Sequence, residues 1–185
     1  MKVLVIDNNS DYFNKLLSLL DEKNIDYFVR KPLDEINKDF CCVIASGGKL
    51  PKNEKNIILE WYRRFLFNLN KPFFGICLAH KILGYIYGAK ILYSHEKGFI
   101  KIKFFKRYPL VPYKDSLIVY QDHDFGLGYL SEKLINYASS STCNVQAIKV
   151  VNKPQFGVQF HPELDENYGN GKLVLENFLR FAGVI

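Results

Sequence analysis

A cysteine between an apolar stretch and a helical pattern is the residue of this sequence best suited to nucleophilic chemistry. The stretch 71–76 contains a glycine at position 75, and Cys77 is followed at 82–87 by apolar residues with helical spacing. Glycine permits a sharp turn, which presents a nucleophile at the end of a strand. The N-terminus of the following helix would favour a thiolate. A small cysteine buried at the end of a core strand fits this stretch equally well.

A histidine and a carboxylate stand close together at the end of a second apolar stretch. The segment 154–163 reads P-Q-F-G-V-Q-F-H-P-E, so His161 ends a predicted strand and Glu163 follows two residues later. Pro162 restricts the backbone between them and favours a fixed turn. If this strand end lies beside Cys77, His161 can accept the thiol proton while Glu163 orients the imidazole. A strand-end histidine beside a helix-capping glutamate is the alternative, and the presence of both motifs in one chain favours the catalytic interpretation.

Two glycines at the end of another predicted strand offer backbone donors. Gly47 and Gly48 follow Ser46, directly after the apolar stretch 42–45. Glycines at such a place allow the backbone to approach a ligand and present an N–H group to it. Together with the N–H of Leu78, such a group would make a two-donor site for a negatively charged oxygen. Glycine pairs usually form ordinary turns, so this signal depends on the two motifs above.

The elements that carry these residues alternate in the first half of the chain. Predicted strands at 2–7, 25–30, 40–45 and 73–76 are separated by predicted helices from 11, over 56–69 and after Cys77. This alternation predicts an α/β fold with a mostly parallel central sheet flanked by helices. After Gly88, short alternating strands predict a smaller antiparallel portion, and 171–181 predicts a final helix. We expect one domain over 1–185. In the helix at 56–69, the spacing predicts an inward face of Ile58, Trp61, Phe65 and Leu69.

Composition narrows the class of protein. With 185 residues and 48% hydrophobic residues, the chain suits one well-buried domain. No segment is long and apolar enough to span a bilayer, and the first apolar stretch has the length of a strand and not of a signal peptide. The four cysteines show no C-x-x-C spacing and no partnering histidine, which argues against a metal site and favours a reducing compartment. We therefore expect a cytoplasmic protein without a metal.

The net charge of +6 raises the question of a nucleic-acid partner. The lysines are scattered, and the densest group is Lys101, Lys103, Lys106 and Arg107, where basic residues alternate with apolar ones as on one face of a strand. A solvated face, or a docking surface for an acidic partner, is favoured over a nucleic-acid site. We expect neither nucleic acid nor membrane as a partner.

The two motifs together resemble the class I (triad) glutamine amidotransferases. The resemblance rests on G-I-C-L-A-H-K at 75–81 with L-G-Y-I-Y-G at 83–88, and on G-V-Q-F-H-P-E at 157–163. It extends from the first strand to the last helix and implies a flavodoxin-like fold. Within the class, four further segments resemble the stand-alone glutaminase subunits of GMP synthase: V-I-D-N at 5–8, S-G-G at 46–48, S-T-C-N-V-Q-A at 141–147 and Y-G at 168–169.

The resemblance implies a role for each matching residue. Cys77 would attack the side-chain amide of glutamine and form a glutamyl thioester. His161 would deprotonate the thiol and then protonate the departing ammonia, and Glu163 would orient His161. The other residues implied are Gly48 and Leu78 for the oxyanion hole, and Gly47, Lys81 and His123 for substrate binding.

The resemblance also implies that the ammonia is used outside this chain. The sequence contains neither G-x-x-x-x-G-K-[ST] nor S-G-G-x-D-S, which are the motifs of nucleotide-binding loops. ATP and Mg²⁺ would act on a separate ATP-pyrophosphatase (synthetase) subunit of GMP synthase, which aminates xanthosine monophosphate, and this chain would hold no cofactor. Low glutaminase activity is expected of the free subunit.

The sequence departs from the family pattern at several positions. Ala79 stands where the family has glycine, Lys81 where glutamine is usual, and Phe125 and Gly126 replace an acidic pair after His123. A lysine can pair with the α-carboxylate of glutamine but cannot accept a hydrogen bond from its α-ammonium group. Two alternatives therefore stay open: the glutaminase component of another synthase, of the anthranilate synthase component II type, and a catalytically impaired regulatory protein with the same fold.

Overall fold

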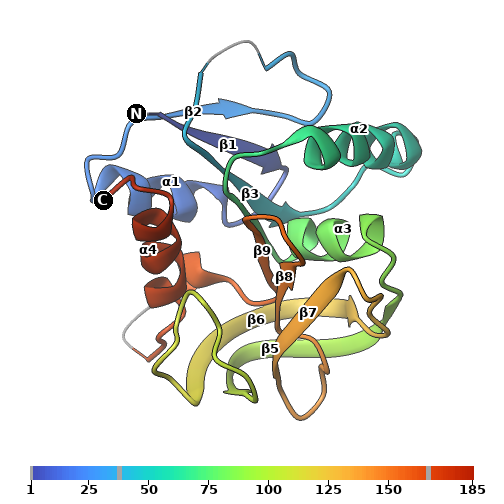
Figure 1. The fold of residues 1–185 in the computed structure, drawn as a ribbon, viewed down its shortest axis with the longest axis vertical. Helices are drawn as coiled ribbons and strands as arrows, with labels where there is room; N and C mark the ends of the chain where they lie inside the picture. Colours follow the sequence, from blue (N-terminus) through green and yellow to red (C-terminus); the bar gives the residue numbers. More distant parts are fainter. Residues whose placement is uncertain (1, 37–38, 166–167) are drawn as a thin grey trace.

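The computed structural model describes residues 2–36, 39–165 and 168–185, and within these ranges the parallel half of one mixed sheet lies between two layers of helices (Figure 1). Its strand order is β2-β1-β3-β4-β9-β8-β7-β5-β6. The strands are β1 (Val3–Asn8), β2 (Tyr27–Arg30), β3 (Cys42–Gly48), β4 (Phe73–Ile76), β5 (Ile91–Phe104), β6 (Ser116–Leu127), β7 (Leu134–Ser139), β8 (Ala147–Val150) and β9 (Gln155–Val158). The helices are α1 (Phe13–Asp21), α2 (Lys55–Asn68), α3 (Leu78–Ile86) and α4 (Lys172–Phe181), with a short 3₁₀ turn at Pro162–Leu164. None of the helices in these described ranges is long and apolar enough to cross a membrane.

The prediction of an α/β fold is confirmed, but that of a mostly parallel sheet is wrong. β2, β1, β3, β4 and β9 are joined by four parallel pairings, whereas β8, β7, β5 and β6 add four antiparallel ones. The antiparallel portion is not the smaller one, because it contains the longest strands, β5 with 14 residues and β6 with 12. Short strands were predicted after Gly88, whereas β5 is long and continuous; a bulge between Tyr93 and Glu96 interrupts its alternation.

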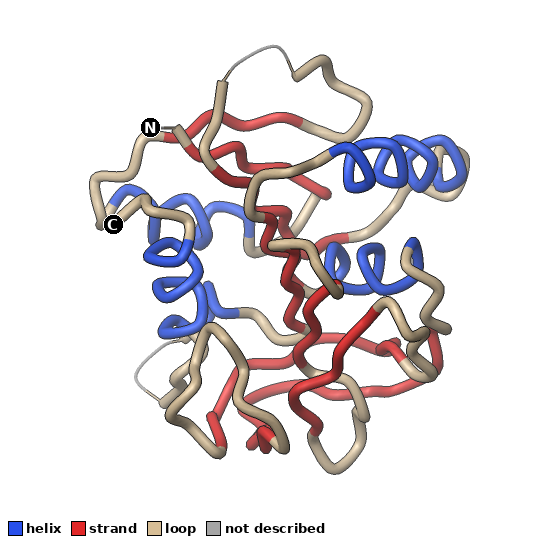
Figure 2. The backbone as a smooth tube through the Cα atoms, viewed as in Figure 1, coloured by secondary structure: helices blue, strands red, loops and turns tan. Residues whose placement is uncertain are grey.

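The parallel half is hydrophobic because both of its faces are covered. Val3 and Val5 of β1 point into a cluster with residues of α1 and α4, whereas Leu4 and Ile6 point into a second cluster with residues of α2 and α3. Figure 2 shows the same division, with the strands running between the two pairs of helices. Alternate side chains of a strand face opposite sides, so an uninterrupted apolar run fills both layers.

The inward face of α2 differs from the predicted one. Ile58 and Leu69 are buried as predicted, but the helix residues buried between them are Tyr62 and Leu66. Trp61 and Phe65 are half-buried and stack on each other, with ring centroids 5.1 Å apart. The helix therefore packs through a ridge of residues spaced by four, which sequence spacing alone does not distinguish from a ridge shifted by one residue.

The basic residues near the end of β5 lie on the side of the strand that faces solvent. Lys101 and Lys103 are exposed, whereas Ile102 between them is fully buried. The predicted alternation along this strand is therefore confirmed. A docking role for this basic face stays a prediction.

Candidate active site

Cys77 lies on a strained turn between β4 and α3. Its backbone has φ +46° and ψ −92°, a conformation that costs a non-glycine residue about 1–3 kcal/mol. The Cys77 N–H donates a hydrogen bond of 2.9 Å to the carbonyl of Val158, which fixes the turn to β9. A Cβ atom on Gly75 would lie 2.9 Å from the carbonyl carbon of Ala79. The turn is therefore tight enough to require glycine at 75, as the sequence predicted.

The sheet places His161 and Glu163 at the same edge as Cys77. β4 and β9 are parallel neighbours, with Ile76 opposite Val158, so their carboxyl ends lie side by side. The Nδ1 atom of His161 lies 2.8 Å from Oε1 of Glu163, and both residues are buried. Glu163 belongs to the 3₁₀ turn that begins at Pro162. The restricted backbone of the proline therefore helps to direct the carboxylate back toward the imidazole.

Gly47 lies against both Cys77 and His161. A Cβ atom placed on Gly47 would be 2.9 Å from Cε1 of His161 and 3.4 Å from Cβ of Cys77. The end of β3 therefore contacts the imidazole and the cysteine together. The three strand ends predicted to meet, those of β3, β4 and β9, are brought together by the structure.

Three polar groups besides His161 surround the sulfur of Cys77. The Nε2 atom of Gln159 lies 3.6 Å from Sγ, the Nζ atom of Lys81 lies 3.8 Å from it, and the carbonyl oxygen of Asp122 lies 4.0 Å away. Sequence reasoning missed Gln159, although it lies two residues before the histidine in the same motif. An alternation of inward and outward residues along 155–161 would have placed it on the same side as His161.

The surroundings of Cys77 favour its ionised form. Burial raises the pKa of the thiol, but hydrogen bonding and charge from His161, together with the charge of Lys81, outweigh burial and leave this pKa below its usual value. For His161, burial lowers the pKa, whereas Glu163 and Cys77 raise it more strongly, so the imidazole pKa lies above its usual value. Shifts in these directions favour a thiolate–imidazolium pair at neutral pH.

The two predicted oxyanion donors lie at the start of α3 and at the end of β3. Leu78 is the first residue of α3, where N–H groups have no partner within the helix. Gly48 has φ +128°, and a Cβ atom there would lie 2.1 Å from the carbonyl oxygen of Asn8. Only glycine fits that place, which explains the residue type at 48 independently of any role in catalysis.

Two departures from the family pattern are accommodated by the fold. Ala79 is fully buried in the core cluster that covers α3, and the helix runs without interruption from Leu78 to Ile86. Lys81 lies beside Cys77, and its Nζ atom donates a hydrogen bond of 3.2 Å to the carbonyl of Phe125. Lys81 is therefore anchored to the end of β6 as well as being close to the sulfur.

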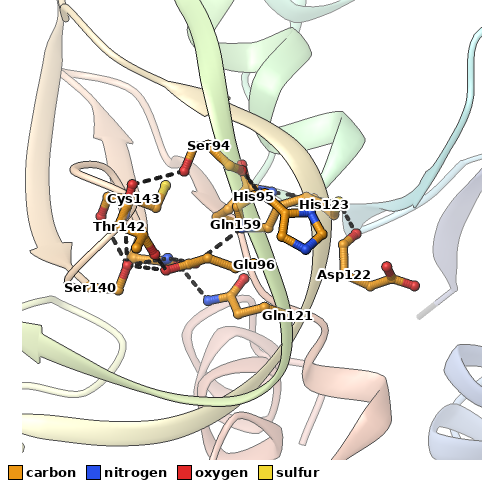
Figure 3. Close-up of polar contacts among 12 residues, drawn as sticks. Ser94, His95, Glu96, Gln121, Asp122, His123, Ser140, Thr142, Cys143 and Gln159 are labelled. Atoms are coloured by element: carbon orange, nitrogen blue, oxygen red, sulfur yellow. Dashed lines mark hydrogen bonds and ion pairs between the residues drawn. The ribbon is translucent and has the colours of Figure 1, made fainter.

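The role of His123 in substrate binding stays a prediction, and the structure shows that this side chain has partners within the protein. Its side chain is fully buried, with Nδ1 2.7 Å from the carbonyl of Ser94 and Nε2 3.2 Å from Oε2 of Glu96 (Figure 3). Glu96 also accepts hydrogen bonds from Gln146, Ser140 and Thr142. Both ring nitrogens are thus used inside the protein, and His123 supports the junction of β5, β6 and β7.

The same junction contains a group of atoms that metals commonly bind. Among the described residues, the ligand atoms of Glu96, His123 and Cys143 lie within 4.8 Å of one another. Both carboxylate oxygens of Glu96 already accept hydrogen bonds, and burial raises the pKa of the Cys143 thiol, which disfavours a thiolate ligand. The donor set is therefore satisfied by the protein itself and does not fit a metal.

The sheet, the strained turn at Cys77 and the buried histidine–carboxylate pair define an α/β protein with a candidate Cys–His–Glu site. This chain belongs to the class-I glutamine amidotransferase family, because the family model matches residues 4–181. The glutamine-hydrolysing GMP synthase subunit from Methanococcus aeolicus is 30% identical, over 99% of this chain and 98% of that protein. The corresponding subunit from Pyrococcus furiosus is 29% identical, over 98% of each chain.

Solved structures show the same fold. A protein from Thermoplasma acidophilum described as a subunit of GMP synthase aligns with a TM-score of 0.87 at 23% identity, over 99% of this chain and 94% of that one. A glutamine amidotransferase from Thermotoga maritima aligns with a TM-score of 0.75 at 20% identity, over 100% and 92% of the two chains. The mixed sheet is therefore shared with other glutamine amidotransferases.

A methyl group at Gly47 is expected to impair catalysis more than folding. Gly47→Ala would push the imidazole of His161 away from Cys77, and a misplacement of about 1 Å can cost roughly 10²-fold in rate. We expect kcat for glutamine hydrolysis to fall by about that factor, with a small change in melting temperature. Gly171→Ala is a matched control, because its added Cβ atom would make only contacts of 3.4 Å. An unchanged kcat in Gly47→Ala would contradict the close packing of Gly47 on the triad.

Proposed function

We propose that this chain is the glutamine-hydrolysing subunit of a two-subunit GMP synthase. It releases ammonia from glutamine, and a separate ATP-pyrophosphatase (synthetase) subunit uses this ammonia to aminate xanthosine monophosphate to GMP. Membership in the class-I glutamine amidotransferase family supports the proposal, as does near full-length similarity to proteins named as the glutamine-hydrolysing subunit of GMP synthase. The observation that carries it is the meeting of Cys77, His161 and Glu163 at one edge of the sheet.

In the first half of the proposed reaction, the Cys77 thiolate attacks the side-chain amide carbon of glutamine. A carbon–sulfur bond forms, and the carbonyl oxygen becomes an oxyanion that the N–H groups of Leu78 and Gly48 stabilise. His161, held by Glu163, then gives its proton to the amide nitrogen. The carbon–nitrogen bond breaks, ammonia leaves, and a glutamyl thioester remains on Cys77.

In the second half, water takes the place of ammonia. His161 removes a proton from the water as its oxygen attacks the thioester carbon. The resulting intermediate collapses, the carbon–sulfur bond breaks, and glutamate leaves. The proton on His161 returns to the sulfur or remains as the imidazolium of the ion pair, so Cys77 and His161 are ready for the next cycle.

In the proposal, the cofactors of GMP formation belong to the partner subunit. ATP and Mg²⁺ act on the synthetase subunit, and no cofactor is assigned to this chain. Such a reaction belongs in the cytoplasm, where four thiols without a pairing pattern remain reduced. Lys81 donates a hydrogen bond to the carbonyl of Phe125 near the end of β6 and also lies close to the sulfur of Cys77. A partner that binds at this end of β6 would alter the contact with the sulfur.

A reconstitution experiment tests the proposed function. The chain is mixed with the synthetase subunit of GMP synthase, and co-elution, glutamate release and GMP formation are measured with and without ATP, Mg²⁺ and xanthosine monophosphate. We expect little glutamate from the free chain, and a strong rise with GMP formation when all components are present. Stimulation only by the synthase subunit of anthranilate synthesis would indicate that alternative. Absence of glutamate under every condition would indicate the catalytically impaired regulatory protein.

Substitution of Lys81 tests its proposed part in substrate binding. Lys81→Gln introduces an amide that can accept a hydrogen bond from the α-ammonium of glutamine, so the KM for glutamine is expected to fall. Removing the positive charge also moves the pH at which Cys77 ionises upward, because Lys81 lowers the pKa of that thiol. Steady-state kinetics over a range of pH values measure both effects. An unchanged or higher KM would show that lysine is an effective substitute at this position.

A further inference from the structure

Tyr12 contacts the predicted catalytic histidine, although no motif in the sequence singled it out. It directly precedes α1, and its ring meets the imidazole of His161 edge-on, with centroids 5.1 Å apart and planes at 76°. A Cβ atom placed on Gly47 would lie 2.9 Å from Cε1 of the same imidazole, so the backbone of Gly47 is close to it. His161 therefore has the backbone of β3 and the ring of Tyr12 as neighbours, in addition to its bond with Glu163.

The hydroxyl group of Tyr12 makes a second contact with the site. It donates a hydrogen bond of 2.5 Å to Oδ2 of Asp122 on β6. The carbonyl oxygen of the same Asp122 lies 4.0 Å from the sulfur of Cys77. In Figure 3 the carboxylate of Asp122 points away from the cluster around Glu96, so this side chain is directed to the opposite side of β6 from His123.

β6 is also bonded directly to the backbone of the histidine. The carbonyl of Tyr120 accepts a hydrogen bond of 2.9 Å from the N–H of His161. The ring of Tyr12 packs edge-on against Tyr120 as well, with centroids 6.4 Å apart. Tyr12 thus joins α1 to the segment of β6 that borders both the sulfur and the histidine.

We propose that Tyr12 is a positioning residue for the Cys77–His161 pair: its ring fixes the imidazole, and its hydroxyl group fixes Asp122 beside the sulfur. Edge-on aromatic contacts have a preferred geometry and add about 0.5–1.5 kcal/mol beyond burial, enough to select one orientation of a ring. The hydrogen bond to Asp122 raises the pKa of Tyr12, so the hydroxyl group remains a donor throughout the working pH range. The role in glutamine hydrolysis rests on the proposed function, whereas the effect on the thiolate does not.

Alkylation of Cys77 by iodoacetamide reports the thiolate without glutamine or a partner. The rate at Cys77 is followed by peptide mass spectrometry over a range of pH values. In Tyr12→Met, which keeps bulk but not the aromatic ring, we expect the rise of this rate to move to higher pH and kcat to fall about 10- to 100-fold, since misplacement of the base by about 1 Å has effects of this size. Tyr12→Phe keeps the ring, so its alkylation profile should match that of the wild type. Tyr113→Phe removes a hydroxyl group from a side chain that is 93% exposed, and is the matched control.

The hydroxyl contact is tested by a double-mutant cycle. Tyr12→Phe and Asp122→Ala should each lower kcat/KM for glutamine, and the double variant should be no worse than the more impaired single one, because both remove one interaction. Asp122→Asn retains an acceptor oxygen and should restore most of the activity. Additive losses would overturn the role of the hydroxyl group, and a wild-type alkylation profile in folded Tyr12→Met would overturn that of the ring. If Tyr12→Met does not fold, the cycle decides.

The two proposals fail in different ways. If no variant or condition yields glutamate but Tyr12→Met still shifts the alkylation profile, the positioning role stands and the proposed function fails. If glutamate is released normally and the profile does not shift, the proposed function stands and the positioning role fails.

Discussion

Cys77→Ala is expected to abolish the release of glutamate from glutamine. The variant removes the protein atom that forms the covalent bond to the amide carbon in the proposed reaction, and the remaining groups position water poorly for direct attack on an amide. Losses on removing a catalytic nucleophile are on the order of 10³-fold or more. The measurement is glutamate formation in the presence of the synthetase subunit, ATP and xanthosine monophosphate.

Two controls separate the loss of the nucleophile from the loss of the fold. With ammonium chloride in place of glutamine, the Cys77→Ala complex should still form GMP, because ammonia then bypasses the site. A glutamine analogue with an electrophilic carbon should label the wild type at Cys77 but not this variant. Cys41→Ala is the matched variant, since Cys41 precedes β3 at the end opposite Gly47, and it should be labelled normally. Full glutamate release by Cys77→Ala would contradict the proposed mechanism.

His161→Ala is expected to cause the second large loss, and one that depends on pH. Without the imidazole, the thiol loses its proton acceptor and the departing ammonia loses its proton donor, so kcat should fall by about 10³-fold or more. Glu163→Ala should cost less, because the carboxylate acts only through the imidazole, which keeps its place between Gly47 and Tyr12. Steady-state kinetics of the two variants measure the difference, and equal or reversed losses would contradict these roles.

The direction of the pH effect follows from the surroundings of the thiol. In the wild type, the pKa of Cys77 is lowered, so its alkylation rate should rise with pH below the range of an ordinary thiol. In His161→Ala the burial remains while the stabilising hydrogen bond and charge are lost, so the pKa of Cys77 rises and the same rise in rate moves to higher pH. At neutral pH the variant should therefore react more slowly with iodoacetamide. A profile that does not move would show that His161 and Cys77 are not coupled.

Local sequence was sufficient to predict the sharp turn at Cys77 and the pairing of His161 with Glu163, whereas their catalytic roles stay predictions. Gly75 is found where the turn requires glycine, Cys77 lies on that turn, and Pro162 brings Glu163 back to His161 as expected. These predictions succeeded because each motif acts over a few residues, and the backbone constraints of glycine and proline are local. The covered parallel strands were predicted for the same reason, since a continuous apolar run is typical of a strand buried on both faces.

Local sequence motifs did not predict how distant segments of the chain pair. An antiparallel portion was predicted, but its extent depends on which strands meet, and a bulge interrupts the alternation of the 14-residue β5. The face of α2 that is buried contains Tyr62 and not Trp61. Which face this is depends on how the helix packs on the sheet. The burial of His123 has the same origin, because only the folded hairpin brings Glu96 and Ser94 to it.

The sequence by itself determined the chemical groups of the site: a thiol on a sharp turn, and an imidazole held near a carboxylate by a proline. Only the tertiary structure decided their environment. It placed Gln159 and Lys81 at the sulfur and Tyr12 against the imidazole. The physical reason is that a covalent turn is fixed by its own few residues, whereas burial and the pKa values that depend on it are fixed by side chains that meet only when the sheet has formed.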